Sequence, residues 1–287
     1  MKFTTYLRDG APRLAVVDGE DLVDLNDANA QVPADLRAAL KAGLDLPSAG
    51  RQAVDSGKRQ PLASAKLAPL VPEPGKIVCL GLNYYDHAKE GGREKPDYPW
   101  FFFRAPSSLV AHGEAGWLPK VSSRFDYEAE LAVVIGRTVP RRTKEADALQ
   151  YVFGYGCFND MSVRDYQKRT PQWTIGKNFD RTGGFGPALV TADELAPGAK
   201  GLRIQSRLNG QVMQDANTDD MIFSVAETIA LLAEVLTLEP GDVIVMGTPA
   251  GVGQARNPPV WMKAGDTIEI EIDRVGLLSN PIANEAA

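Results

Sequence analysis

The chain has 287 residues, enough for one large domain or for a domain with a small appendage, and 44% of them are hydrophobic. Its 31 basic and 37 acidic residues leave a net charge of −6, and no run of Lys or Arg could follow a phosphate backbone, so we expect no nucleic-acid partner. No N-terminal leader and no apolar run of membrane-spanning length is present, which predicts a cytoplasmic protein with no membrane partner.

The first 70 residues alternate short strand-like runs with turns. We expect strands at 2–7, 13–17 and 22–25, separated by Asp-Gly turns, and then a short helix at 33–41. A proline-rich stretch at 61–75 has weak periodicity and suits a linker better than a core element. These patterns predict a small N-terminal α/β domain over residues 1–70 and a second domain over residues 71–287.

Strand-like runs dominate the second domain. They lie at 76–81, 100–104, 129–136, 152–159, 202–208, 242–246 and 267–272. Only 162–169 and 224–236 have a helical pattern, the latter with an apolar stripe formed by Val225, Ile229, Leu232 and Leu236. The sequence therefore predicts a mostly β (α+β) fold.

Two glutamates stand two residues apart at the start of the run at 129–136. Glu128 and Glu130 leave the same face of a strand, and a like-charged pair on one face needs a cation, a proton or open water. The pair Glu269 and Glu271 has the same spacing, but its strict alternation with isoleucine predicts one buried and one solvated face. Only Glu130 leads into a continuous apolar stretch, which is typical of a strand covered on both sides. On these residues alone, a metal site and an ordinary pair are equally favoured.

A third carboxylate follows the aromatic strand at 152–159. Asp160 stands where this strand meets a polar helical segment, a position at which aspartate usually caps a helix. Arg164 and Gln167 follow at helical spacing and would suit an anionic ligand. With only two histidines in the chain, carboxylates are the available metal ligands, and such an all-oxygen set favours Mg²⁺, with Mn²⁺ or Ca²⁺ as substitutes.

Five motifs in order resemble the fumarylacetoacetate hydrolase family over essentially all of residues 70–280. They are the stretches at 81–90 and 126–131, Phe158-Asn159-Asp160 with Arg164 and Gln167, the stretch at 176–180, and the stretch at 247–253. The resemblance implies a mixed β-sandwich or roll as the C-terminal domain and a metal held by Glu128, Glu130 and Asp160. It also implies a homodimer.

The resemblance further assigns catalytic roles to His87, Glu90 and Lys177. Taken alone, a histidine three residues before a glutamate is more often a surface helix pair. In this setting Glu90 would orient the imidazole, which takes a proton from water or from a substrate carbon, and Lys177 would stabilise the developing oxyanion. The glycine-rich turn at 247–253 is either an ordinary loop or a site that presents Thr248 to a substrate carboxylate.

The chain departs from the larger fumarylacetoacetases of this family. Residues 79–83 hold no acid where those proteins have a further aspartate ligand, and only about 70 residues precede the shared region. The sequence looks more like the shorter branch, which contains acylpyruvate hydrolases, oxaloacetate decarboxylases, and isomerases or decarboxylases of keto diacids from aromatic catabolism. His112 lies outside every motif, and a charged stretch at 91–96 is either a lid or a surface loop.

The function that we expect is metal-dependent hydrolysis of a C–C bond in a small 2,4-diketo acid, of the acylpyruvate or fumarylpyruvate type. Decarboxylation or isomerisation of a keto diacid uses the same activated keto acid, and the sequence does not choose among these reactions. A noncatalytic ligand-binding protein of the same fold is the alternative of another class, although the presence of both His87 and Glu90 argues against it.

Overall fold

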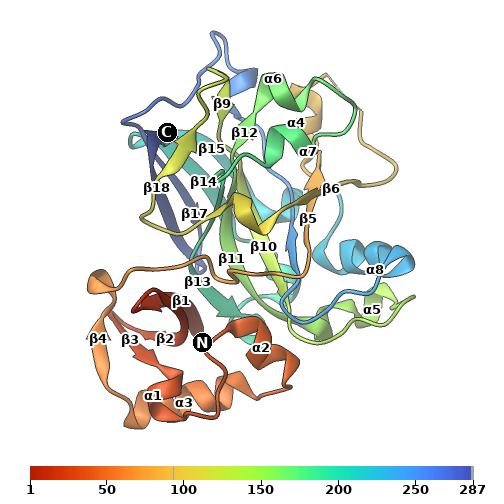
Figure 1. The fold of residues 1–287 in the computed structure, drawn as a ribbon. Helices are drawn as coiled ribbons and strands as arrows, with labels where there is room; N and C mark the ends of the chain where they lie inside the picture. The colour runs from red at the N-terminus through yellow and green to blue at the C-terminus, as the bar shows by residue number, and fades with distance from the viewer. Residues whose placement is uncertain (93, 286–287) are drawn as a thin grey trace.

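The computed structural model describes residues 1–92 and 94–285 and contains two sheets packed on each other, with short helices around them (Figure 1). The larger sheet is built from β1 (Lys2–Arg8), β2 (Ala11–Asp18), β3 (Asp21–Asp24), β4 (Arg59–Pro61), β5 (Ile77–Gly81), β6 (Trp100–Arg104), β7 (Leu109–Val110), β10 (Ala129–Ile135), β11 (Val152–Asp160), β13 (Gly183–Thr191) and β16 (Val243–Val245). The second sheet is built from β8 (Gly116–Leu118), β14 (Arg203–Leu208), β15 (Gln211–Asn217), β17 (Thr267–Ile272) and β18 (Gly276–Asn284), and β9 (Phe125–Asp126) pairs with β12 (Ser162–Val163). The predicted mostly β fold is confirmed.

The helices are short and lie around the two sheets. They are α1 (Leu25–Ala28), α2 (Leu36–Lys41), α3 (Leu46–Ser56), α4 (Tyr85–Glu90), α5 (Glu145–Ala148), α6 (Arg164–Gln167), α7 (Thr174–Lys177) and α8 (Val225–Val235). Three of them, α4, α6 and α7, gather at one end of the larger sheet, at the upper right of Figure 1. Among the described residues, no helix is long and apolar enough to cross a bilayer.

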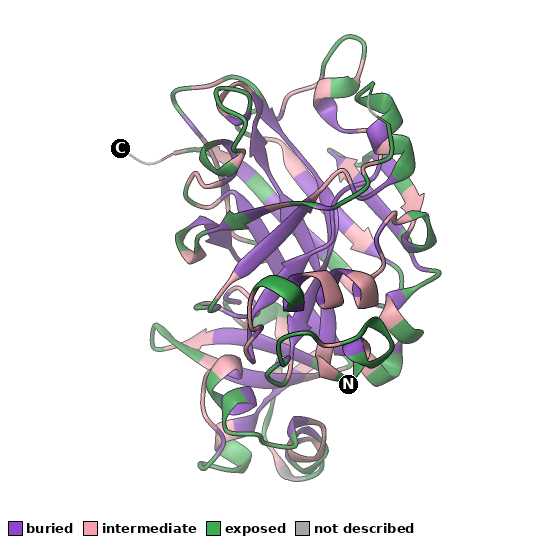
Figure 2. Ribbon diagram, turned by 90° about the vertical axis from the view of Figure 1, so that its right-hand side faces the viewer, coloured by how far each residue is buried: buried purple, intermediate pink, exposed green. Residues whose placement is uncertain are grey.

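β10 lies in the middle of the larger sheet and is covered on both sides. It pairs antiparallel with β11 on one edge and with β16 on the other. Every residue of β10 is buried, and alternate side chains enter different cores: Leu131 and Val133 pack with the second sheet, whereas Ala132 and Val134 pack toward the N-terminal segment. The buried strands form the centre of Figure 2. The continuous apolar run of β10 is therefore explained by burial of both faces of the strand, as the sequence predicted.

The N-terminal strands extend the larger sheet. β1 pairs antiparallel with β13, with Lys2 opposite Val190 and Phe3 opposite Leu189. This segment, red to orange in Figure 1, forms the base of the molecule. A division into domains at residue 70 stays a prediction, because the backbone hydrogen bonds of the sheet continue across it.

The proline-rich stretch at 61–75 differs from the expected linker. It has little regular structure, but Leu70 and Val71 are buried, and Ala68 donates its backbone N–H to the carbonyl of Thr5. Its apolar side chains therefore pack on β1 although its prolines prevent a regular ladder. The stretch is part of the core and not a free connection.

Three further features differ from the predicted elements. The expected helix at 162–169 is a strand bridge, β12, followed by the single turn α6. The sequence analysis did not predict the strands β13, β15 and β18 or the helix α3. β13 was missed because its sequence begins Gly-Gly-Phe-Gly-Pro, yet its glycines leave room for neighbours: a Cβ on Gly184 would lie 2.6 Å from the Asn280 side-chain oxygen.

Candidate metal centre

Three carboxylates converge where β10 begins and β11 ends. The register pairs Ala129 with Asn159, which sets Glu128 and Glu130 beside Asp160. One oxygen from each of the three carboxylates lies within 4.8 Å of the others, and all three side chains are buried. The sequence placed these acids on separate elements, and the antiparallel pairing of β10 with β11 brings them together.

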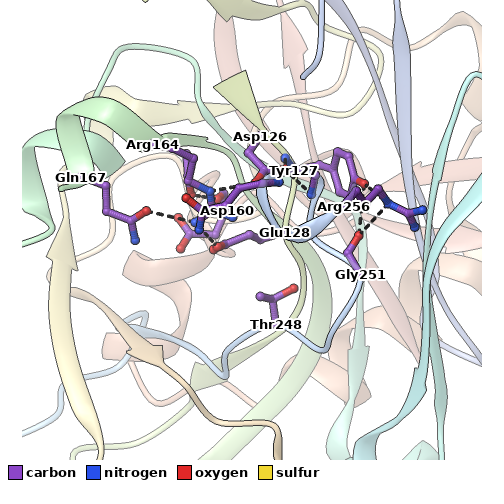
Figure 3. A network of polar contacts seen from close by, with 12 residues as sticks. Asp126, Tyr127, Glu128, Asp160, Arg164, Gln167, Thr248, Gly251 and Arg256 are labelled. Carbon is purple, nitrogen blue, oxygen red and sulfur yellow. Dashed lines mark hydrogen bonds and ion pairs between the residues drawn. The ribbon is translucent and has the colours of Figure 1, made fainter. Parts of the chain in front are cut away.

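Cationic side chains neutralise two of these carboxylates. Lys177, at the end of α7, places its Nζ 2.5 Å from Glu128 and 2.6 Å from Asp160. Arg164 Nη1 lies 2.7 Å from the other Glu128 oxygen, and the buried Arg104 pairs with the other Asp160 oxygen. In Figure 3, Arg164 and Gln167 reach from α6 toward Glu128 and Asp160. Gln167 accepts a hydrogen bond of 3.0 Å from Arg164.

Glu130 has no such cation. Within residues 1–92 and 94–285 it makes no ion pair, and its Oε2 accepts a backbone N–H from Gly247 at 2.6 Å. Burial, followed by the negative charges of Asp160 and Glu128, raises the pKa of Glu130 well above its usual range. Burial also raises the pKa of Glu128, but Arg164 and Lys177 outweigh burial and lower that pKa to about 2.

A divalent cation fits this arrangement. Lys177, Arg164 and Arg104 are already paired with Glu128, Asp160 and the neighbouring Asp126, so Glu130 is the carboxylate of the cluster whose charge is left for a bound cation to balance. The donor atoms are all oxygens, which suits Mg²⁺ or Mn²⁺ better than zinc or copper. Burial lowers the pKa of Lys177, but the charges of Asp160 and Glu128 raise it above the ordinary value, so the side chain is an ammonium donor.

The second Glu-x-Glu pair is solvated, as predicted. Glu269 and Glu271 point to the half-exposed face of β17 while the isoleucines between them are buried. Both glutamates pair with Arg207, at 3.1 and 2.5 Å. The two pairs share one spacing and differ in burial, which was the distinction drawn from the sequence.

Asp160 does not cap a helix. It is the last residue of β11, and the residue that precedes α6 is Val163, which makes no side-chain cap. The carboxylate of Asp160 is instead held by Lys177 and Arg104. The usual role of aspartate at such a junction is therefore the wrong reading here.

A second group, the dyad, lies on α4. His87 Nδ1 is 3.2 Å from one Glu90 oxygen, and the other Glu90 oxygen accepts the backbone N–H of Gly251 at 3.0 Å. Gly251 has a φ of +102°, and a Cβ there would lie 2.3 Å from the Met213 carbonyl oxygen, so only glycine fits. The glycine-rich turn thus fixes the carboxylate of Glu90 through the Gly251 N–H, and Glu90 in turn orients the imidazole of His87.

One cavity of about 800 Å³ joins the two groups. Its lining includes the dyad His87 and Glu90, the glutamates Glu128 and Glu130, and Arg164, Gln167, Lys177 and Thr248. Asp160 is fully buried next to this cavity. Eight of the nine predicted site residues therefore face one space, and the ninth contacts Lys177, which lines it.

Several supporting residues had no role in the sequence analysis. Asp126 accepts the backbone N–H groups of Gly253 and Gln254 at 2.7 and 3.0 Å, and its Oδ2 pairs with Arg164 at 2.8 Å. Asn83 donates to the carbonyl of Met246 at 2.7 Å. Both residues stand inside stretches that were singled out, so their positions next to the site residues were the available signal.

Comparison with known proteins assigns the chain to a family. Residues 76–283 match the family described as fumarylacetoacetate (FAA) hydrolase C-terminal. The chain belongs to the fumarylacetoacetate hydrolase family. This confirms the resemblance read from the five motifs.

Two relatives within the fumarylacetoacetate hydrolase family are named as oxaloacetate tautomerases. The chain is 40% identical over 273 residues to oxaloacetate tautomerase fahd2, mitochondrial, of Xenopus laevis, covering 94% of this chain and 85% of that protein. It is 38% identical over 286 residues to oxaloacetate tautomerase YisK of Bacillus subtilis (strain 168), covering 93% and 94%. The predicted shorter branch of the family is thereby confirmed.

A solved structure of the family carries a metal and a keto acid. Maleylpyruvate hydrolase from Sphingobium sp. SYK-6, in complex with manganese (II) ion and pyruvate, is 31% identical, has a TM-score of 0.83, and covers 100% of both chains. Metal binding and enzymatic activity are therefore found among fumarylacetoacetate hydrolase relatives of this chain.

Two remaining features are outside the site. His112 accepts the backbone N–H of Ser279 at 3.1 Å through its Nδ1, and burial lowers its pKa. Its contact is with β18, away from the cavity lining. The stretch at 91–96, for which the sequence left a lid and a surface loop open, includes residue 93, which lies outside the described residues.

Proposed function

We propose that this protein interconverts the keto and enol forms of a small 2-keto diacid, with oxaloacetate as the first candidate substrate. The observation that carries the proposal is one cavity in which a histidine–glutamate dyad, a lysine ammonium and a buried carboxylate cluster face each other. Two relatives that align over more than nine-tenths of the chain are named for this reaction.

The charge of the cavity supports a dianionic substrate. Lys168 and Arg169 line it together with Arg164. Burial, followed by repulsion from Arg164 and Arg124, lowers the pKa of Lys168, which places these cations close together. A cluster of positive charges at one wall is best relieved by an anionic ligand, so we assign the distal carboxylate of the substrate to Lys168 and Arg169.

The carboxylate cluster supplies the metal chemistry. We propose that Glu128, Glu130 and Asp160 hold Mg²⁺ or Mn²⁺, which polarises the keto group of a 2-keto acid when it is bound. Thr248 and Gln167 line the same space and offer a hydroxyl and an amide to the substrate. Arg164 is buried and pairs with one Glu128 oxygen while Lys177 pairs with the other, so the two cations hold this carboxylate in place.

His87 is the group that moves the proton. With Glu90 engaging Nδ1, the neutral imidazole carries its hydrogen on Nδ1 and leaves Nε2 free as a base. His87 Nε2 takes a proton from the carbon next to the keto group, and the electron pair of that C–H bond forms the carbon–carbon double bond. Negative charge then develops on the keto oxygen, where the Lys177 ammonium stabilises it. This oxygen takes a proton from water to give the enol, and the imidazolium of His87 returns its proton to water, so that the base is regenerated.

Hydrolysis of a 2,4-diketo acid is the second candidate. The same His87 can deprotonate water in place of a carbon acid, and water attack on the distal carbonyl would release pyruvate and a second acid. The relative with bound manganese and pyruvate is named for such a reaction. Decarboxylation or isomerisation of a keto diacid uses the same activated carbonyl and is tested in the same panel.

The test follows substrate absorbance with purified protein in Mg²⁺, in Mn²⁺ and in EDTA. We expect the protein with metal to speed the relaxation of enol oxaloacetate to its keto form, and His87→Ala to lower this rate by about 10²-fold or more. Pyruvate release is assayed in parallel with oxaloacetate, an acylpyruvate, fumarylpyruvate and a hydroxymuconate-type diacid. Turnover of an acylpyruvate without tautomerisation would favour hydrolysis, and inactivity on every substrate would favour a noncatalytic binding protein.

A further inference from the structure

Gln214 contacts the candidate site from a different sheet. It lies on β15 in the second sheet, and its side chain is 1% exposed. It belongs to none of the five motifs. A buried amide side chain must find partners for two N–H groups and for an oxygen with two lone pairs.

All four of these hydrogen-bonding positions are occupied. The Gln214 amide nitrogen donates to Thr248 Oγ1 at 2.7 Å and to the Pro249 carbonyl at 2.8 Å. Its oxygen accepts the backbone N–H of Ala129 at 3.0 Å and the Ser206 hydroxyl at 2.9 Å. The Pro249 carbonyl only accepts and the Ala129 N–H only donates, so the orientation of the amide is settled by its partners.

The hydrogen bond to Thr248 fixes what that hydroxyl can do. Because Gln214 donates to Thr248 Oγ1, the hydroxyl hydrogen is left to be donated elsewhere. The Pro249 carbonyl already receives a hydrogen from the same amide. Thr248 lines the cavity, so the donor direction that remains is toward a ligand there. In Figure 3, Thr248 stands on its loop below Glu128.

The same amide also holds the strand of the metal ligands. Ala129, whose N–H it accepts, lies between Glu128 and Glu130. The loop of Thr248 packs tightly on β15, since a Cβ on Gly251 would lie 2.3 Å from the Met213 carbonyl oxygen and 3.3 Å from Gln214 Cα. One side chain therefore joins the ligand strand to the substrate loop.

We propose that Gln214 is a positioning residue that makes Thr248 a hydrogen-bond donor toward a substrate carboxylate. This inference rests on the proposed function only in assigning a carboxylate ligand to the cavity. Gln214 itself touches no substrate atom; it acts through the hydroxyl of Thr248. A purely structural role would instead stabilise β15 without any effect on ligand affinity.

The decisive variant is Gln214→Glu, which keeps the size and the oxygen acceptor. The glutamine amide donates two hydrogens, one to Thr248 and one to the Pro249 carbonyl. A glutamate side chain has no hydrogen to donate when ionised and only one when protonated, and that one goes to the Pro249 carbonyl, which can only accept. Thr248 then donates its hydrogen to the new carboxyl group and no longer into the cavity. Gln205→Glu is the matched control, because Gln205 is a buried amide on the neighbouring strand β14 and its contacts are with Asp215 and Arg207.

Binding of oxalate to the Mn²⁺-loaded protein, measured by titration calorimetry, is the readout that does not depend on turnover. We expect Gln214→Glu and Thr248→Val each to weaken oxalate binding by about 10-fold or more. The double variant should be weaker than Thr248→Val by less than about 3-fold, since the two changes remove the same hydrogen bond. Thr248→Ser, which keeps the hydroxyl that Thr248→Val removes, should bind oxalate with near wild-type affinity, and Gln205→Glu should leave the affinity for oxalate unchanged. With oxaloacetate, Gln214→Glu should raise KM with little change in kcat.

Three results would overturn the proposal: folded Gln214→Glu with wild-type affinity for oxalate, independent and multiplying effects of the two substitutions, or no oxalate binding by the wild-type protein. Circular dichroism and thermal melts identify any variant that has failed to fold, and Gln214→Asn, which keeps the donor on a shorter side chain, then takes the place of Gln214→Glu. Inactivity on keto acids together with the expected oxalate pattern would contradict only the proposed reaction.

Discussion

Replacing Glu130 with glutamine separates the charge of the carboxylate cluster from its shape. Glu130 is buried and has Gly247 N–H as a partner, but it stands beside Glu128 and Asp160 without a cation of its own. Glutamine keeps the acceptor for Gly247 and turns an N–H donor toward two carboxylates. The raised pKa of Glu130 means that the metal-free protein must on folding either bury this charge or take up a proton, and glutamine removes that cost, which we expect to stabilise the metal-free protein by about 1–4 kcal/mol.

The expected change in melting temperature follows from the size of the chain. A protein of 287 residues unfolds with an entropy of about 0.6 kcal/mol/K, taking about 2.1 cal/mol/K for each residue. The metal-free Glu130→Gln protein should therefore melt about 2–7 °C higher than the wild type.

The stabilisation by metal should be nearly lost in Glu130→Gln. At 100 times the Kd, Mn²⁺ stabilises the wild-type protein by about 2.7 kcal/mol, which is about 4–5 °C. If loss of the Glu130 ligand weakens Mn²⁺ binding about 100-fold, the same Mn²⁺ concentration stabilises the variant by only about 0.4 kcal/mol. This corresponds to a rise in melting temperature of less than about 1 °C. Glu130→Gln should thus gain stability without metal and lose its response to metal.

Scanning calorimetry in EDTA and in MnCl₂ tests this reasoning. Glu269→Gln is the matched control, because it has the same Glu-x-Glu spacing on a half-exposed face and pairs with Arg207. That control should change the free energy of unfolding by less than about 0.5 kcal/mol and should keep the Mn²⁺ response. A Glu130→Gln protein that melts lower in EDTA and still responds fully to Mn²⁺ would refute the role of Glu130.

Two further predictions concern the turn and the second histidine. Gly251→Ala adds a Cβ that would lie 2.3 Å from the Met213 carbonyl oxygen at a φ of +102°, so it should lower both the melting temperature and kcat/KM. Gly210→Ala has a similar φ of +80° with nothing within 4 Å, and equal losses in the two variants would rule out the contact as the cause. Burial lowers the pKa of His112 in the folded protein, so the unfolded chain binds more protons below about pH 6.5, and the folded protein loses stability as the pH falls through that range. His112→Asn, whose amide oxygen can accept the same N–H, should have a flatter stability profile in urea melts between pH 7 and pH 5, and an unchanged profile would show that His112 does not titrate as described.

The central strand of the fold was predictable because its burial is written in its composition. The run after Glu130 lacks polar residues because both faces of β10 are covered. On β17, polar and apolar residues alternate because one face of that strand meets water. β13 carried no such signal. Its glycines are required by side chains from other strands, such as Asn280, which only the assembled sheets bring near.

The candidate site was predictable in its residue types and not in its connections. Glu128, Glu130 and Asp160 were identified from spacing and from family motifs, although the usual role of an aspartate at a strand end would have made Asp160 a cap. The contact of Arg104 with Asp160, and those of Gln214 with Thr248 and Ala129, join elements far apart in the chain. Such contacts depend on how the sheets pack, for which no local pattern exists.

Crystals of the protein grown with MnCl₂, with diffraction recorded at the manganese absorption edge, give the most direct test of the metal centre. We expect one strong anomalous peak bounded by carboxylate oxygens of Glu128, Glu130 and Asp160, and loss of this peak in Glu130→Gln crystals. A wild-type map with no peak between these three side chains, or with manganese bound only elsewhere, would contradict it.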